Sequence, residues 1–303
     1  MDAAAGTDED VSVVICSRNR PALLGDAIES VLAGELLPRE LVVVDQSDRP
    51  HPTLRTGLVG ECDLRYLHSA ETGLSRARNE GIRASGRPIV VFIDDDVVVE
   101  RAWLGALVEE LRRDGPRTVV TGQVRPVDHA GARGYQLSLK VDEAPAVYEG
   151  RIGRDPLFAG NMAIFRSAFG EIGRFDVRLG AGSRFPSSED NDFGFRLLEA
   201  GYRIVYVPGA VVHHRTWRSR KGFIALSWHY GRGQGAFYAK YWRSPDGYAR
   251  GRMAADARHQ LRSAPRKLAR GRIVPIVGGA VFLAGVGAGA IEWTLTKPAP
   301  SPG

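Results

Sequence analysis

Short, continuous apolar runs alternate along the first hundred residues with segments in which apolar residues recur every three or four positions. Runs of strand length occupy 11–17 (VSVVICS), 40–48 (ELVVVDQSD) and 88–96 (PIVVFIDDD). Helical spacing fills the intervals at 20–34 and 73–86. Strands that alternate with helices predict an α/β fold with a parallel sheet and connections over its faces.

Polar residues stand where each of these apolar runs ends: Ser17 after the first, Asp45 in the second, and Asp94, Asp95 and Asp96 after the third. Ligands of parallel α/β sheets bind beyond the carboxyl ends of the strands, so we expect these side chains to form one site. Three adjacent carboxylates repel one another, and a hard divalent cation such as Mg²⁺ or Mn²⁺ would relieve that repulsion. The alternative is a solvated acidic turn.

A second group of chemically active residues lies between positions 187 and 214. The acidic cluster SSEDND (187–192) opens a helical pattern, for which Ser188 is the predicted N-cap and the acids suit the helix dipole. A strand pattern follows and ends on His213 and His214. The segment 216–272 is basic and aromatic, with helical spacing in places.

Charge is distributed unevenly along the chain. Up to Val212 there are 25 Lys and Arg against 32 Asp and Glu, whereas from His213 onward there are 16 against 3. A strongly basic C-terminal third predicts binding to an anionic surface. Trp and Tyr beside Lys and Arg favour a membrane surface over nucleic acid, which we do not expect as a partner.

The uncharged stretch 273–291 would be ~28 Å long as a helix, about one hydrocarbon core. We therefore expect a C-terminal transmembrane or membrane-inserted helix, and an interfacial or core helix is the alternative. The acidic N-terminus carries no apolar signal sequence, and Cys16 and Cys62 fit a reduced compartment. The expected location is the cytoplasmic face of the cell membrane.

Several motifs together resemble the inverting family 2 glycosyltransferases, which have the GT-A fold. The resemblance implies an α/β fold with a Rossmann-like mixed, mostly parallel sheet and helices on both faces. In chain order the motifs are VSVVICSRNRP, LVVVDQSD, TGLSRARNEGIRASG, VVFIDDD, GRFD, SSEDNDFGFRLLEAGYRIVYVP and VVHH. The resemblance covers roughly residues 10–215 and is far more specific than any single motif. It implies a domain at 10–215, followed by a helical extension at 216–272 and the apolar helix at 273–291.

The resemblance also implies roles in nucleotide binding. Asp45 would receive the nucleobase, usually uracil, although Gln46-Ser47 departs from the Asp-Gly-Ser common in the family. Ser17 and Arg78 would hold the nucleotide. Asp94 or Asp95 would reach the ribose.

For the chemistry, the resemblance implies that Asp96 binds the metal with Asp94 and His214, and that His213 competes with His214 for that role. Asp190 would be the general base that takes the proton of the acceptor hydroxyl. Glu189 and Asp192 are the alternatives for the base. Gly160 and Asn161 would form the floor of the acceptor site.

These inferences predict a metal-dependent, non-processive glycosyltransferase. It would move a sugar from a nucleotide-sugar, expected to be a UDP-sugar, to a glycan or lipid-linked acceptor near the membrane. The alternatives are a sugar nucleotidyltransferase and an inactive sugar-nucleotide-binding module. Retention of both the Asp triplet and Asp190 argues against the inactive module. The sequence leaves a homo-oligomer open and does not give the identity of the sugar.

Overall fold

The computed structural model describes residues 6–127, 134–135, 138–215 and 218–296. The chain divides into two compact units. The sheet domain comprises Met1–Ala132, Gln136–Val177 and Asp190–Trp217. The helical unit comprises Arg133–Tyr135, Arg178–Glu189 and Arg218–Gly303. The segment 178–189 thus belongs with the C-terminal helices, although it lies in the middle of the chain.

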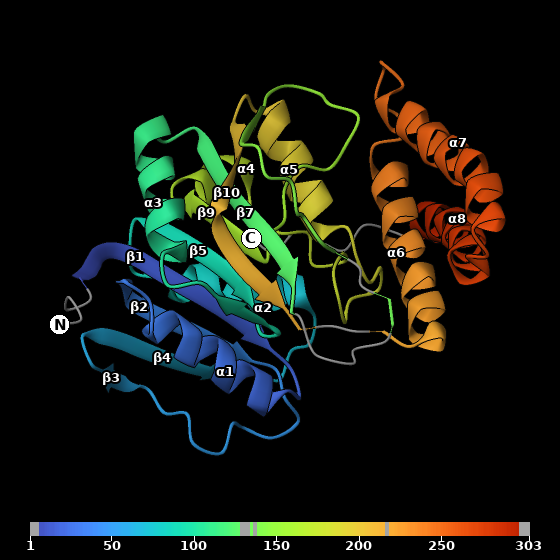
Figure 1. Cartoon of the computed structure of the whole chain (residues 1–303). Coiled ribbons are helices and arrows are strands. Elements are labelled where there is room, and N and C mark those ends of the chain that lie inside the picture. The colour runs from blue at the N-terminus through green and yellow to red at the C-terminus, as the bar shows by residue number, and fades with distance from the viewer. Residues whose placement is uncertain (1–5, 128–133, 136–137, 216–217, 297–303) are drawn as a thin grey trace. The chain divides into compact units, whose positions relative to one another are not determined.

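The sheet domain is built on one sheet in the order β3-β4-β2-β1-β5-β9-β7-β10-β6, with β8 paired to β10 (Figure 1). Its strands β1, β2, β4 and β5 run parallel, and β9 runs antiparallel to its neighbours β5 and β7. The strands are β1 Gly6–Ser17, β2 Leu36–Asp45, β3 Gly57–Val59, β4 Cys62–His68, β5 Ile89–Asp94, β6 Val97–Val99, β7 Thr118–Pro126, β8 Ala146–Tyr148, β9 Asn161–Phe165 and β10 Arg203–His214.

Helices cover both faces of this sheet, which confirms the predicted fold class. They are α1 Pro21–Leu32, α2 Leu74–Ala84, α3 Trp103–Asp114, α4 Ala168–Ile172 and α5 Glu189–Glu199. Successive side chains of β1 alternate between the faces. Val13 and Ile15 join the core under α1 and α3, and Val14 and Cys16 join the core under α2, α4 and α5. Burial on both faces explains why the strands appear as continuous apolar runs.

The helical unit contains α6 Arg220–Lys240, α7 Tyr248–Ala269 and α8 Ile273–Leu295. Ser219 caps α6, its hydroxyl accepting a hydrogen bond from the Gly222 backbone N–H at 3.1 Å. Helices α6 and α8 pack in parallel through glycines: a Cβ on Gly235 would lie 2.0 Å from the Val286 carbonyl oxygen. Among the described residues, α8 is the one helix long and apolar enough to cross a membrane by length and composition, with a mean hydropathy of 2.0.

Candidate active site

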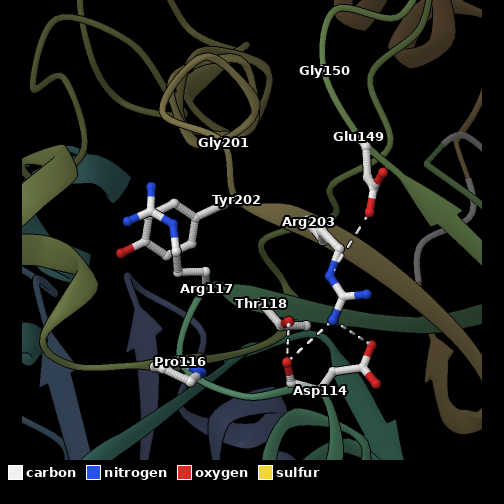
Figure 2. A pocket seen from close by; sticks show the side chains of 9 residues that line it. All are labelled: Asp114, Pro116, Arg117, Thr118, Glu149, Gly150, Gly201, Tyr202 and Arg203. Atoms are coloured by element: carbon white, nitrogen blue, oxygen red, sulfur yellow. Dashed lines mark hydrogen bonds and ion pairs between the residues drawn. The ribbon is translucent and has the colours of Figure 1, made fainter.

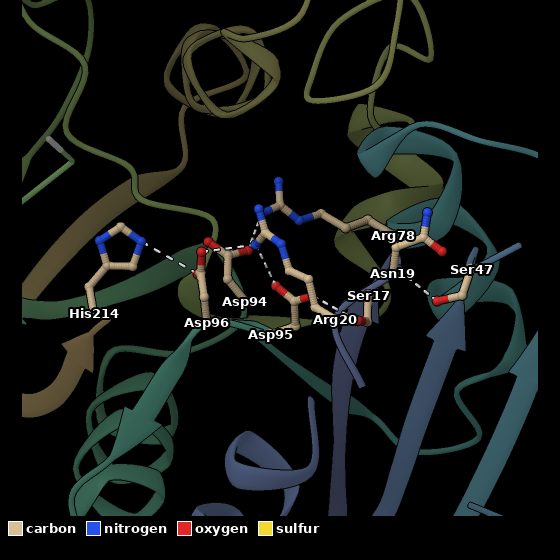
Figure 3. Close-up of polar contacts among 9 residues, drawn as sticks. All are labelled: Ser17, Asn19, Arg20, Ser47, Arg78, Asp94, Asp95, Asp96 and His214. Carbon is tan, nitrogen blue, oxygen red and sulfur yellow. Dashed lines mark hydrogen bonds and ion pairs between the residues drawn. The ribbon is translucent and has the colours of Figure 1, made fainter. Parts of the chain in front are cut away.

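Strand register brings the sequence-predicted residues to one edge of the sheet. Ser17 lies opposite Asp45 in the β1–β2 pair, and Cys16 lies opposite Asp94 in the β1–β5 pair. Because these strands are parallel, their carboxyl ends share an edge. Figure 3 shows the resulting cluster, in which side chains from separate segments point toward the Asp triplet.

Asp94 accepts a hydrogen bond from the Arg78 guanidinium, with 3.0 Å between Oδ1 and Nη2. The Arg78 side chain is only 4% exposed, so this ion pair satisfies a buried cation. The backbone of Gly160 approaches the other side of Asp94, where a Cβ would stand 2.1 Å from Oδ2. A glycine at position 160 is therefore a requirement of the Asp94 conformation.

Asp95 is buried and held by two donors. Its Oδ2 accepts from the Ser17 hydroxyl at 2.7 Å, and its Oδ1 accepts from the Arg20 guanidinium at 3.0 Å. Burial raises the pKa of Asp95 to about 6, against the lowering effects of the Ser17 hydrogen bond and of Arg20. Arg20 was not among the residues predicted from the sequence. Its position just beyond β1, at the same edge as the aspartates, was the available signal.

Asp96 has partners on each carboxylate oxygen. Arg20 donates to Oδ2 at 3.0 Å, and the His214 ring Nε2 lies 3.4 Å from Oδ1. His213 instead lies against Glu100, with 2.9 Å between Nε2 and Oε1. Successive residues of a strand point to opposite faces, so only one histidine of the pair can face the triplet. The structure places His214 there.

Asp45 is oriented by two neighbours. Its Oδ1 accepts from the backbone N–H of Ser47 at 2.9 Å and also from the Ser47 hydroxyl. Its Oδ2 accepts from the Tyr66 hydroxyl at 2.7 Å. Tyr66, on β4, was not identified from the sequence because the pairing of β4 with β2 is a tertiary fact.

Asp190 lies in the first turn of α5, and its Oδ1 accepts from the Asn191 backbone N–H at 2.9 Å. Aromatic packing fixes α5 relative to the triplet. Phe193 of α5 packs on Phe175 with ring centroids 4.6 Å apart, and Phe175 packs edge-on against Phe92 of β5, two residues before Asp94. The Arg78 guanidinium lies 5.4 Å from the Phe175 ring centroid.

The two acids that the sequence offered as alternatives to Asp190 are buried. Asp192 is fully buried and accepts from Arg196 at 3.0 Å, a structural ion pair within α5. Glu189 is 8% exposed. Of the three acids, Asp190 is the least buried, and an acceptor hydroxyl can approach it most readily.

Two sequence-based expectations differ from the structure. Ser188 is not an ordinary N-cap: its φ is +68°, and its hydroxyl donates to the Gln234 side chain at 3.0 Å. Asn161 does not offer its side chain to an acceptor. It is fully buried, its Oδ1 accepts from the Trp103 indole N–H at 2.8 Å, and its amide donates to backbone carbonyls.

Among the described residues, no group of three or more His, Cys, Asp or Glu side chains forms a preformed metal site. The donors of Asp94, Asp96 and His214 nevertheless suit a divalent ion. Carboxylate oxygens and an imidazole nitrogen bind Mn²⁺, and Mg²⁺ keeps several positions for water and phosphate oxygens. Adjacent donors around an octahedral ion lie about 3 Å apart. The 3.4 Å between Asp96 Oδ1 and His214 Nε2 is close to that spacing.

A cavity of about 480 Å³ opens at the other end of the sheet (Figure 2). Its walls include the first residues of β7 and β10, whereas His214 is the last residue of β10. Its charged groups are paired: Arg203 lies 3.4 Å from the Asp114 carboxylate and 3.9 Å from Glu149, and Arg117 lies 3.1 Å from Glu171. The cavity is therefore separate from the candidate active site. It is lined by Asp114, Pro116, Arg117, Thr118, Glu149, Gly150, Gly201, Tyr202 and Arg203.

Comparison with known proteins adds family relationships to this geometry. The family described as Glycosyl transferase family 2 matches residues 12–173. The pre-mycofactocin glycosyltransferase of Mycobacterium tuberculosis is 33% identical over 233 residues, which cover 72% of this chain and 46% of that protein. The succinoglycan biosynthesis protein ExoM of Rhizobium meliloti is 29% identical over 84% of this chain and 78% of its own length.

The fold is also similar to that of a solved mannosyltransferase, PcManGT from Pyrobaculum calidifontis, in complex with GDP-mannose and Mn²⁺. The TM-score is 0.57 at 18% identity, over 97% of this chain and 91% of that one. At this identity the likeness concerns the fold alone. The chain spans about half the length of the mycobacterial relative.

Proposed function

We propose that this chain, which belongs to glycosyl transferase family 2, is a non-processive inverting glycosyltransferase. It transfers a sugar from a nucleotide-sugar to a hydroxyl group of a glycan or lipid-linked acceptor. The observation that carries the proposal is the convergence of Ser17, Arg78, the Asp triplet and His214 at the carboxyl edge of the sheet.

The nucleotide half of the donor binds along this edge. Asp45, held by Tyr66 and Ser47, receives the nucleobase, and we propose uracil. Arg78 and Ser17 fix Asp94 and Asp95, whose carboxylates meet the ribose. Because buried donors already hold these carboxylates in one conformation, ligand binding loses less side-chain conformational entropy.

A divalent ion, Mn²⁺ or Mg²⁺, fits the donors of Asp96, His214 and Asp94. When bound, it offsets the negative charge that develops on the diphosphate leaving group. Arg20 bridges Asp95 and Asp96 and offsets part of the triplet's charge.

Asp190 acts as the general base. Its carboxylate takes the proton of the acceptor hydroxyl, the acceptor oxygen forms a bond to the anomeric carbon, and the bond from that carbon to the diphosphate oxygen breaks with its electron pair. Attack opposite the leaving group inverts the configuration. Proton removal by a positioned carboxylate contributes typically 10²–10⁴-fold to such a step.

We also propose that the chain works at the cytoplasmic face of a membrane. Helix α7 carries six Lys and Arg against one Asp, and apolar side chains are exposed on the same helix, with Leu261 at 68% and Leu268 at 63%. A basic helix with exposed leucines suits an anionic lipid surface. A lipid-linked acceptor would be presented there.

Calorimetry and donor hydrolysis test the proposal. Wild type should bind UDP in the presence of Mn²⁺, and Asp96→Ala should lose at least ten-fold in that affinity. Asp190→Asn should bind normally but lose at least 100-fold in turnover of the donor that a sugar-nucleotide panel identifies. A parallel titration with GDP tests the uracil assignment. Turnover by Asp190→Asn at the wild-type rate would refute the assignment of the base.

A further inference from the structure

The last turn of α8 is tied to the segment 178–187, which precedes Asp190 in the chain. Glu292 accepts from Arg184 of that segment, with 2.9 Å between Oε1 and Nε, and also pairs with Arg232 of α6. The next residue, Trp293, packs against the Phe185 ring with centroids 5.2 Å apart. The guanidinium carbon of Arg178 lies 3.8 Å from the Trp293 ring centroid.

The same segment is held from α6. The Ser187 hydroxyl donates to the Tyr230 carbonyl at 3.2 Å, and Ser188 donates to Gln234. A Cβ on Gly233 would stand 2.1 Å from the Ser187 hydroxyl oxygen, so helix and segment are in close contact. These contacts hold Ser188 at its positive φ, a strained conformation that persists only when the surroundings fix it.

The rest of α8 is fixed to α6 along most of its length. A Cβ on Gly278 would meet the Phe223 ring at 2.5 Å, and a Cβ on Gly289 would meet the Arg232 carbonyl oxygen at 2.0 Å. The contacts run in the same order along both helices. Separating α8 from α6 would break this packing as well as the Glu292 ion pairs.

The covalent chain limits how far these attachments can lie from the sheet domain. Arg178, which stacks on Trp293, follows the buried core residue Phe175 by three positions. Three extended residues span at most roughly 11 Å. Arg184 precedes Asp190 by six positions, or at most roughly 22 Å. A hydrocarbon core is about 30 Å thick, so the C-terminal end of α8 cannot lie across a bilayer from the sheet domain while these contacts hold.

We infer that α8 does not cross the membrane, although its composition would allow a crossing. Helix α6 begins six residues after His214 of β10, at most roughly 22 Å along the chain, and Phe223 in its first turn packs against Gly278 near the start of α8. Both ends of α8 are therefore tied by short chain segments to the side of the sheet domain, and its last turn braces the segment 178–187. The apolar face that α6 leaves open includes Ile291 at 63% exposed and Leu295 at 79%. On an in-plane helix this face lies toward the lipid. The topology of α8 relative to the membrane does not depend on the proposed sugar transfer.

Cysteine accessibility tests the topology in membrane vesicles from a bacterial expression host. Single reporters are Leu295→Cys at the end of α8, Arg272→Cys before its start, and Glu61→Cys on the sheet domain as the matched reference. All three positions are solvent-exposed. The native Cys16 and Cys62 are buried, and burial raises their thiol pKa values to about 12 and about 11, so they provide a low background.

All three reporters should react with a membrane-impermeant maleimide in inside-out vesicles and none in right-side-out vesicles. Protein recovered free of membranes, with all three labelled, would equally exclude a crossing. Labelling of Leu295→Cys only from the side opposite to Glu61→Cys would overturn the inference.

The bracing role has its own readout. Glu292→Ala should increase hydrogen exchange at the backbone amides of 178–187 at least five-fold. Thr294→Ala is the matched control, because Thr294 is exposed and its hydroxyl donates only within α8, to the Ile291 carbonyl at 2.7 Å. Equal exchange in the two variants would show that the Glu292 ion pair does not hold the segment.

Discussion

The most direct probe of the site is a single methyl group at position 160. In Gly160→Ala the added Cβ would stand 2.1 Å from Asp94 Oδ2 and 2.6 Å from its Cγ. Ordinary contact between a carbon and an oxygen atom needs more than 3 Å, so the Asp94 side chain has to move by about 1 Å or rotate. Either change breaks its hydrogen bond to Arg78.

The cost follows from the burial of Arg78, whose side chain is only 4% exposed. Loss of a hydrogen bond to a charged group costs about 1.5–3 kcal/mol. Replacing glycine by alanine offsets about 0.4–1 kcal/mol by restricting the unfolded chain. The net destabilisation is about 1–2 kcal/mol, equivalent to roughly 2–8 °C in Tm for a domain of this size. Displacement of Asp94 and Arg78 should also weaken nucleotide binding about ten-fold, which is ~1.4 kcal/mol.

Calorimetry with UDP and Mn²⁺, beside thermal unfolding, measures both effects. Gly105→Ala in α3 is the matched control, because a Cβ there meets nothing within 4 Å and alanine favours the helix. It should bind the nucleotide normally and unfold at the same or a higher temperature. If Gly160→Ala bound UDP within two-fold of wild type, the reasoning about Asp94 would be refuted.

Three further outcomes are expected. His214→Ala should lower the Mn²⁺-dependent affinity for UDP at least five-fold, whereas His213→Ala should leave it unchanged; equal effects in calorimetry would contradict the register argument. Tyr66→Phe removes a hydrogen bond to Asp45 and should weaken UDP binding several-fold at a stability cost of about 1 kcal/mol. Burial lowers the pKa of Lys140 to about 8, so the unfolded chain binds more protons between pH 8 and about 10.4 and stability rises with pH across that window. Urea unfolding should show this rise relative to Lys140→Met, and a constant difference between the two proteins would exclude it.

Local sequence patterns predicted the strands β1, β2, β5 and β10, the helices α1, α2 and α5, and the acids that follow these strands, but not β4, β7 or α3. Short continuous runs of β-branched residues favour buried strands, and an acid at the end of such a run falls on the edge where α/β sheets bind ligands. These local features are enough to predict the fold class and the position of Ser17, Asp45 and the Asp triplet at one edge of the sheet.

Which side chains meet across that edge depends on contacts between residues far apart in the chain. His213 and His214 are equivalent in the sequence, and pairing of His214 with Val97 in the β10–β6 ladder selects the one that faces Asp96. Tyr66 reaches Asp45 through the pairing of β4 with β2. The composition of 273–291 equally fits a membrane span and a packed helix. The observations that bear on the choice between them are long-range contacts such as that of Glu292 with Arg184, 108 positions earlier in the chain. Composition and periodicity reflect local conformational preferences, whereas contacts between residues far apart in the sequence form only when the chain folds.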